Sequence, residues 1–221
     1  MAAEPRYYDI RRVCGEVTQI DIDNGNVEQA GTSYYDKATV RVLEDLGWGI
    51  LSAPGDTTGS EHLRRDLLEQ ALKASVVTNE RVDIGTAPSR IHPVPKVGED
   101  PRSVSIEEKV AILQDLEKAA AGEGITSRRV TYIEKAEQVS FTDSSGNEYR
   151  YELCRCGFSV LAVASRAGVV QMGYERDHTI RGLNIRHRHD LARESAERAS
   201  SLLDAKPAKG GIMKAILDPE L

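Results

Sequence analysis

The sequence has few of the residues that mark secreted, membrane-spanning or disulfide-bonded proteins. Only three of its 221 residues are cysteines, and an odd, sparse set of this kind cannot form a disulfide framework. The longest uncharged apolar stretch, around residues 158–164, is far shorter than the roughly 20 residues that cross a bilayer. The N-terminus carries Glu4 and Arg6 where an export signal would be apolar. We therefore expect a cytoplasmic protein with no membrane partner.

The sequence also has no excess of positive charge. It has 29 Lys and Arg residues against 35 Asp and Glu residues, which gives a net charge of −6. A chain of this kind offers no broad basic surface, so the sequence argues against a nucleic-acid partner. With 40% hydrophobic and 29% charged residues, it can build one large or two small cores without disulfides or metals.

Standard catalytic motifs are missing as well. The chain contains no H-E-x-x-H, no G-x-x-x-x-G-K-[ST] and no G-x-S-x-G. The segment Gly47-Trp48-Gly49 fails the dinucleotide-binding pattern at its third glycine. We therefore predict no catalytic residue in this segment and no cofactor bound to it.

Two pairs of residues have the spacing of metal ligands. Cys154 and Cys156 share a face of a predicted strand, as would His187 and His189 in an extended segment. The cysteines could form a metal or redox pair, but no second Cys or His pair stands at ligand spacing, which favours partly buried packing. The two histidines alternate with arginines, whose charge repels a divalent ion and favours a solvated helix start. No metal ligand is predicted, and the remaining histidines are His62, His92 and His178.

Other charged and aromatic residues have a functional and a structural interpretation. The arginines near the C-terminus could bind phosphate, but interleaved acids favour an exposed, ion-paired face. Paired carboxylates are explained by a helix cap or a turn, and strand aromatics are more often packing residues than a peptide groove. No substrate-binding residue is assigned. The residues concerned are Arg181, Arg186, Arg188, Arg193 and Arg198 with Asp190, Glu194 and Glu197; Glu107, Glu108, Asp21 and Asp23; and Trp48, Tyr34 and Tyr35.

The first part of the chain predicts several strands followed by a helix. Asn24-Gly25 suits the positive φ angles of a type I′ hairpin turn. A helix is predicted from near Ser60 to about Val76, because leucines recur there at helical spacing. The predicted strands are Tyr7–Val13, Val17–Ile22, Val27–Tyr35, Ala38–Leu43 and Trp48–Ala53.

The second part repeats this order of elements. Glycines at hairpin turns recur at one offset, because Gly25 and Gly146, and also Gly47 and Gly168, are separated by 121 residues. Asn26 and Asn147 share this offset, which indicates a structural duplication. The predicted strands are Arg129–Ile133, Gln138–Thr142, Glu148–Leu153, Gly157–Ala164 and Val169–Tyr174, followed by a helix over about 191–203.

The fold class predicted from these patterns is α+β. Residues 1–78 form a first β-rich unit with a covering helix, and residues 79–104 form a proline-rich linker. Residues 105–205 contain a linker helix and the second unit; the helix spans Ser105 to about Ala121 and starts with a capping box that includes Glu108. Residues 206–221 are a linker and the start of a truncated C-terminal domain, because Ile212–Leu217 has the length of a strand but no partner.

Several segments together resemble the TldD/PmbA family. The segment from Asp23-Asn24-Gly25-Asn26-Val27-Glu28 through Thr39–Leu43 to Gly47-Trp48-Gly49 is similar to the opening of that family. Ser105–Leu113 resembles its V-S-x-x-E-K helix. The stretch from Arg198-Ala199 to Gly210-Gly211 resembles its R-A-x-x-L-L-x-A-x-P linker, and Ile216-Leu217-Asp218-Pro219 its V-L-D-P strand.

This resemblance implies a metallopeptidase of unfolded or extended peptides, in a family also named as modulators of DNA gyrase. In TldD-type members an H-E-x-x-x-H metal site follows the V-L-D-P strand, and PmbA-like members lack those ligands. This chain ends before that site, so the resemblance implies an inactive N-terminal half, zinc in the full-length TldD-type protein, and a homo- or hetero-oligomer with a TldD/PmbA-like subunit. Two other hypotheses remain: a stand-alone assembly module that pairs with a separate catalytic subunit, and a small metal protein or enzyme that uses Cys154, Cys156 and the His187 region.

Overall fold

The structure is a computed structural model that describes residues 5–45, 47–55, 59–75, 97–207, 210–212 and 214–218. Its centre is one six-stranded antiparallel sheet with the strand order β3-β2-β1-β4-β5-β6. The strands are β1 (Tyr7–Asp23), β2 (Asn26–Glu44), β3 (Gly47–Pro54), β4 (Ile125–Asp143), β5 (Glu148–Arg166) and β6 (Val169–Thr179). The helices are α1 (Glu61–Ser75), the short 3-10 helix η2 (Pro101–Ser103), α2 (Ile106–Ala119) and α3 (His189–Leu202). The predicted α+β class is confirmed.

The four inner strands are longer than the sequence predicted. Each of β1, β2, β4 and β5 is continuous over 17 to 19 residues, whereas the apolar pattern had divided each into two strands. The pattern weakens in the middle of β1, where Cys14-Gly15-Glu16 interrupts the apolar alternation. There β1 is paired on both sides, with β2 and with β4, so backbone hydrogen bonds continue the strand where the side chains do not. The predicted break was therefore wrong.

The two units of the duplication join at β1 and β4 into this single sheet. Their hairpin turns adopt the predicted positive φ angles, with φ 49° at Asn24 and 81° at Gly25. The strongest equivalence is a close helix contact. A Cβ on Gly49 would lie 1.8 Å from the carbonyl oxygen of Ala71 in α1, and a Cβ on Gly173 would lie 1.9 Å from that of Ser195 in α3. Each unit therefore seats its helix directly on the backbone of its outer strand.

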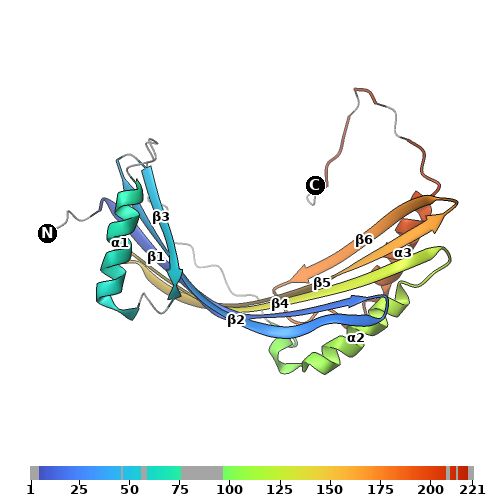
Figure 1. Ribbon diagram of the computed structural model, residues 1–221, viewed down its shortest axis with the longest axis horizontal. Helices are drawn as coiled ribbons and strands as arrows, with labels where there is room; N and C mark the ends of the chain where they lie inside the picture. Colours follow the sequence, from blue (N-terminus) through green and yellow to red (C-terminus); the bar gives the residue numbers. More distant parts are fainter. Residues whose placement is uncertain are drawn as a thin grey trace.

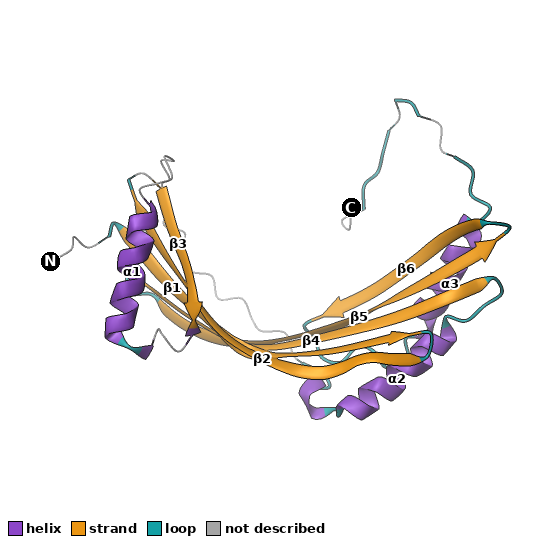
Figure 2. Ribbon diagram, viewed as in Figure 1, coloured by secondary structure: helices purple, strands orange, loops and turns teal. Residues whose placement is uncertain are grey.

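The three α-helices of the described residues cover the same face of the sheet. The sheet curves strongly, and Figures 1 and 2 show α1 on the outside of one wing and α2 and α3 on the outside of the other. The concave face carries no helix among the elements described. Alternation along each strand sends successive side chains to opposite faces, so the covered face is apolar where the helices lie and the concave face is available to solvent.

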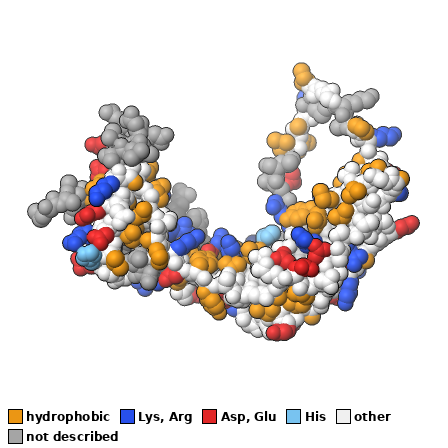
Figure 3. Space-filling view, viewed as in Figure 1, with side chains coloured by type: hydrophobic (Ala, Val, Ile, Leu, Met, Phe, Trp, Pro, Cys, Tyr) orange, Lys and Arg blue, Asp and Glu red, His pale blue; other side chains and the backbone are white. Residues whose placement is uncertain are grey.

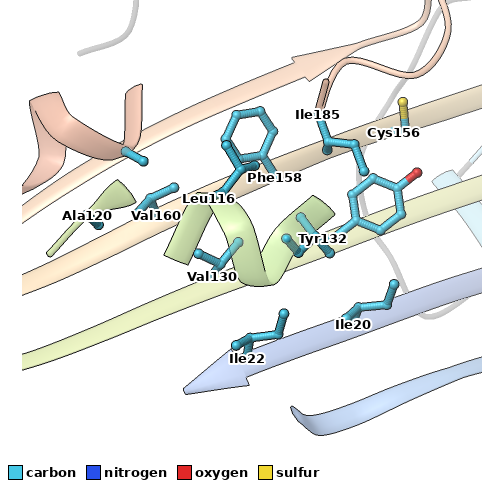
Figure 4. Close-up of a cluster of buried hydrophobic side chains, with 12 residues drawn as sticks. Ile20, Ile22, Leu116, Ala120, Val130, Tyr132, Cys156, Phe158, Val160 and Ile185 are labelled. Carbon is cyan, nitrogen blue, oxygen red and sulfur yellow. The ribbon is translucent and has the colours of Figure 1, made fainter. Parts of the chain in front are cut away.

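The main core lies under α2, which β1, β4 and β5 support (Figure 4). Smaller clusters lie under α1 and under α3. The main cluster contains Ile20, Ile22, Leu113, Leu116, Ala120, Val130, Tyr132, Cys156, Phe158, Val160, Ile185 and Ala192.

A buried ion pair fixes α2 on the sheet. The Lys109 Nζ of α2 lies 2.6 Å from the Glu134 Oε2 of β4, and both side chains are 3% exposed. The Tyr132 hydroxyl donates to the same carboxylate oxygen at 2.8 Å, and burial raises the pKa of this hydroxyl far above its usual value. The pair is embedded in the main core, so losing one charge would leave the other uncompensated.

The start of α2 follows the predicted cap only in part. The Ser105 Oγ accepts a hydrogen bond from the Glu108 amide at 3.2 Å, as expected for an N-cap. The Glu108 carboxylate, which a capping box would turn back toward Ser105, instead accepts from Arg186 at 2.7 Å. Arg186 also donates to Glu99 with two nitrogens at 2.8 Å, so it ties the segment before α2 to the segment before α3.

The predicted strand Ile212–Leu217 does not form. Its described residues, 212 and 214–217, have no regular secondary structure, and Ile212 and Ile216 are fully exposed. No helix in the described ranges is long and apolar enough to cross a membrane.

Candidate functional site

The concave face has a cluster of hydrogen-bonded and stacked side chains on the wing formed by β1, β2 and β3. Asp9 is 1% exposed and accepts from Arg41 Nε at 2.9 Å and from Arg41 Nη2 at 2.6 Å. The guanidinium lies 5.0 Å from the centre of the Trp48 ring, which meets Tyr7 edge to face at 6.0 Å. Burial, and then Asp9, raise the pKa of Tyr7 to about 12. Trp48 is therefore a packing residue here, as the structural interpretation predicted.

A short ladder of aromatic rings stands beside this cluster. Phe141 of β4 stacks on Tyr149 of β5 with ring centres 4.6 Å apart, and Tyr149 stacks on Tyr151 at 6.4 Å. Tyr149 is 49% exposed and Tyr151 is 41% exposed, so one side of the ladder faces solvent. Exposed aromatic groups on a sheet face can pack against a bound chain.

The opposite wing ends in an exposed apolar edge strand. Val170, Met172 and Tyr174 alternate along β6 on the concave side, and each is between 48% and 60% exposed. Hydrophobic side chains gather along this inner rim in Figure 3. Beneath them Tyr174 pairs with Leu161 and Met172 with Val163, so the apolar surface continues onto β5. We call these five residues the β6 apolar strip.

A basic pocket of about 570 Å³ adjoins the strip toward the middle of the sheet. The His178 ring lies over Gly157, because a Cβ at that position would be 2.3 Å from His178 Cδ2. Arg155 forms an ion pair with Glu137, which also accepts from the Tyr35 hydroxyl. No acidic residue is among those lining the pocket, which are Ile133, Lys135, Arg155, Cys156, His178, Thr179, Ile180 and Arg181.

A larger pocket of about 940 Å³ lies at the middle of the sheet. Cys14, Tyr34, Asp36, Arg102, Glu152 and Cys154 are among its lining residues. Three of its charged side chains are paired, because Arg102 Nη2 lies 2.7 Å from Asp100 and Asp36 accepts from Arg12 Nε at 2.8 Å. The hydrogen bonds from Arg12 hold the pKa of Asp36 below its usual value.

The residues that the sequence marked as possible metal or redox sites do not form such a site among the described residues. The Cys156 thiol donates to the Gly182 carbonyl at 3.2 Å. Cys154 lies two residues away on the same strand, and the two thiols have no third metal-ligating side chain beside them among the described residues. His189 opens α3 and lies 2.9 Å from Asp115, while His187 is exposed. Within the described ranges, no three His, Cys, Asp or Glu side chains gather as a metal site would require. His92 lies outside the described residues.

The remaining candidates have structural partners. Three of the five C-terminal arginines form the expected ion pairs: Arg188 with Asp177, Arg198 with Glu175 and Glu194, and Arg186 with Glu99 and Glu108. Asp21 accepts from the Thr131 hydroxyl at 2.7 Å, Asp23 pairs with Arg129, and His62 lies 3.1 Å from Asp66. Tyr34, at 79% exposure, has no comparable packing.

Sequence reasoning missed the β6 apolar strip and the basic pocket. The signal for the strip was present, because Val170, Met172 and Tyr174 alternate with Gln171 and Gly173 in a predicted strand. The pocket had no such signal. Lys135, Arg155 and Arg181 are far apart in the sequence, and only the pairing of β4 with β5, and the position of the end of β6, bring them together.

We expect Cys154 and Cys156 to react slowly with thiol reagents in the folded protein. Burial raises the pKa of each thiol to about 11, so at pH 8 almost none of either is the reactive thiolate. In a Cys14→Ser variant, Cys154 and Cys156 are the only remaining cysteines. Iodoacetamide should label these two thiols at least about tenfold more slowly in the folded protein than in denaturant. Rapid labelling of the folded variant would restore the redox-pair interpretation.

Comparison with known proteins agrees with the order of the two units. Residues 8–75 match the model described as PmbA/TldA metallopeptidase domain 1, and residues 99–203 match the PmbA/TldA metallopeptidase central domain. A metalloprotease of Methanocaldococcus jannaschii is 32% identical over 97% of this chain and 48% of its own length. A metalloprotease of Archaeoglobus fulgidus is 31% identical over 98% of this chain and 49% of its own length. The chain thus spans about half the length of these relatives.

Solved structures share the fold at low sequence identity. A Bacteroides thetaiotaomicron protein, named for modulation of DNA gyrase, superposes with a TM-score of 0.72 at 13% identity, covering 93% of this chain and 48% of its own. TldE from Thermococcus kodakarensis gives a TM-score of 0.62 at 12% identity, covering 88% of this chain and 44% of its own. With both family models matched in order along the chain, this protein belongs to the TldD/PmbA family, whose models carry the name PmbA/TldA metallopeptidase.

Proposed function

We propose that this chain is the N-terminal, non-catalytic half of a TldD/PmbA-type metallopeptidase that acts on unfolded or extended peptides. In this proposal the concave sheet face forms a wall of the substrate chamber. The observation that carries it is the asymmetry of the sheet: three helices cover one face, while the other leaves aromatic rings and the β6 apolar strip exposed. An exposed apolar surface of this kind marks an interaction site more often than a free surface.

The metal of such an enzyme does not fit the residues described here. No three donor side chains come together within those residues, and burial keeps the Cys154 and Cys156 thiols protonated. We therefore assign no metal ligand and no hydrolytic step to this part of the chain. Zinc, in this proposal, belongs to the half of the relatives' length that the chain does not span.

Contact with another TldD/PmbA-like subunit is part of the same proposal. The sheet ends in two edge strands, β3 and β6, and an open edge can pair with another chain. A cytoplasmic location is also proposed, supported by three free cysteines. The acidic net charge argues against nucleic acid as the direct partner, so the gyrase-related names of relatives are not carried over as a function.

The reading frame after the codon for Leu221 tests the proposal. If codons for H-E-x-x-x-H follow, the longer product should hydrolyse an unfolded protein and lose that activity to a chelator, whereas the chain of 221 residues should be inactive. Zinc binding in stoichiometric amount together with peptide hydrolysis by the shorter chain would contradict the assignment.

The open sheet edges also favour the second candidate, a stand-alone assembly module that pairs with a separate catalytic subunit. A stop codon directly after Leu221 would support this candidate. It predicts that the chain co-purifies with a TldD/PmbA-like subunit encoded elsewhere and restores that subunit's peptidase activity when the two are mixed.

A further inference from the structure

The concave side of β6 carries two kinds of side chain in a fixed order. Along the strand, alternate residues on this side are Val170, Met172, Tyr174, Arg176 and His178, and all five are exposed. The first three are apolar and the last two can carry positive charge. Alternate residues of a strand lie about 6.6 Å apart, so an added strand beside β6 would place its own alternate side chains next to these residues in the same order.

The outer edge of β6 is available for such a neighbour. β6 is the last strand of the sheet, and no strand among the described residues pairs with its outer side. An extended peptide can add to an edge of this kind through main-chain hydrogen bonds, while pockets beside the edge select alternate side chains. Every strand pair in this sheet is antiparallel, so an added strand in the same pattern would run opposite to β6.

The surface near the C-terminal end of β6 carries many positive charges for an acidic protein. Lys135, Arg155 and Arg181 line the basic pocket, and Arg176 stands beside it on β6. Arg155 is paired with Glu137, but no carboxylate of the described residues lies within ion-pair distance of Lys135, Arg176 or Arg181. A chain with a net charge of −6 thus presents three cations outside ion-pair distance of any described carboxylate in or next to this pocket, although Lys135 also acts on the charge of Glu137.

Gly157 makes room for the His178 ring at this end of β6. Its missing side chain lets the His178 ring lie across β5 toward Ile133, which occupies the same row of the sheet. The His178 ring and the Ile133 side chain both line the basic pocket. Arg155, Arg176 and Arg181 are exposed, so a carboxylate bound there would pair with them through interactions that salt screens.

We propose that the outer edge of β6 binds an extended acidic peptide, with its carboxylates over the basic pocket and its apolar side chains against the β6 apolar strip. This rests on the proposed function, because it names the class of peptide that the chamber selects. In the antiparallel direction the peptide carries alternating acidic residues first and alternating apolar residues after them. Charge complementarity favours this occupant over a second copy of this acidic chain.

Fluorescence anisotropy with a short labelled peptide tests the proposal on the chain of 221 residues. The peptide alternates threonine with two glutamates and then three valines, and its control carries glutamine in place of glutamate. We expect the glutamate peptide to bind about tenfold more tightly than the control at low salt, and the difference to shrink as salt rises. Equal affinity for the two peptides would overturn the proposal.

Matched variants locate the site. Arg176→Gln combined with Lys135→Gln should weaken the glutamate peptide about tenfold and leave the glutamine peptide unchanged. Arg64→Gln removes an exposed cation of α1 and should change neither peptide. Arg176→Glu should reverse the preference toward a peptide with lysine in place of glutamate, a result that a merely structural role for Arg176 could not produce. Equal loss in Arg64→Gln and the double variant would assign the effect to net charge.

Two further outcomes separate this proposal from its alternatives. A single-stranded oligonucleotide of equal charge that displaces the peptide and binds more tightly would show that the basic pocket serves nucleic acid, and would overturn the proposal.

The binding result is also independent of catalysis. Peptide binding with the expected charge dependence in a chain whose longer product lacks peptidase activity would refute the proposed function and leave the peptide site standing. If the longer product hydrolyses peptides and the Arg176 variants do not change this activity or the binding of the glutamate peptide, the proposed function stands and the β6 peptide site is refuted.

Discussion

Replacing Lys109 with methionine should lower the free energy of unfolding by about 3–5 kcal/mol, the range for breaking one side of a buried ion pair. The Glu134 carboxylate, 3% exposed, would remain in the core with the Tyr132 hydroxyl as its hydrogen-bond donor and without a countercharge. Urea denaturation followed by circular dichroism measures the change. The m-value should stay constant, because the folded state still buries the same surface.

A second variant separates charge from packing. Lys109→Met combined with Glu134→Gln removes both charges and keeps a hydrogen-bonding group beside Tyr132. We expect this double variant to be more stable than Lys109→Met alone, since no charge is then left buried without a partner. If the two variants unfold at the same urea concentration, the loss comes from the packing of the Lys109 side chain, and the ion pair contributes little.

Adding one methyl group at Gly173 should destabilise the protein by about 2–3 kcal/mol, at the upper end of the range for overpacking. The new Cβ of Gly173→Ala would lie 1.9 Å from the Ser195 carbonyl oxygen and 2.6 Å from the Ala199 amide nitrogen. Both are backbone atoms of α3, so no side-chain rotation can relieve the contact and the helix itself must move. Thermal and urea unfolding give the loss directly.

Gly31→Ala is the matched control. Gly31 also lies inside a long strand, but a Cβ there meets no atom within 4 Å and its φ angle is not in the left-handed region. The same chemical change should therefore leave stability within about 0.5 kcal/mol of the parent, or raise it slightly through the unfolded chain. If both variants lose similar stability, the close seating of α3 on β6 is not the cause.

These two contacts explain how the concave face remains free. Gly173 and its counterpart Gly49 allow α3 and α1 to sit on the strand backbone, and Lys109 fixes α2 between them. The apolar side chains of the core are buried between the sheet and its helices on one face, so the other face can carry exposed aromatic, apolar and basic groups. The helix-bearing face supplies stability, and the concave face supplies the candidate binding surface.

Local patterns in the sequence predicted most elements and missed how far the strands extend. The α2 helix and its Ser105 cap, the Asn24-Gly25 turn and the duplication were all readable, because each depends on residues close together in the chain or at a constant offset. The middle of β1 was not, since Cys14-Gly15-Glu16 has no strand pattern of its own. It is extended because β2 and β4 pair with it from both sides.

The sequence by itself determined the class, the two related units, the turns, the likeness to one family and the lack of a standard catalytic motif. All of these follow from composition, spacing and local backbone preference. Only the tertiary structure decided that the two units share one sheet, that all three helices cover one face, and that Lys135, Arg155 and Arg181 meet beside β6. The physical reason is that a strand pattern shows which residues alternate, whereas pairing between distant strands decides which side chains become neighbours.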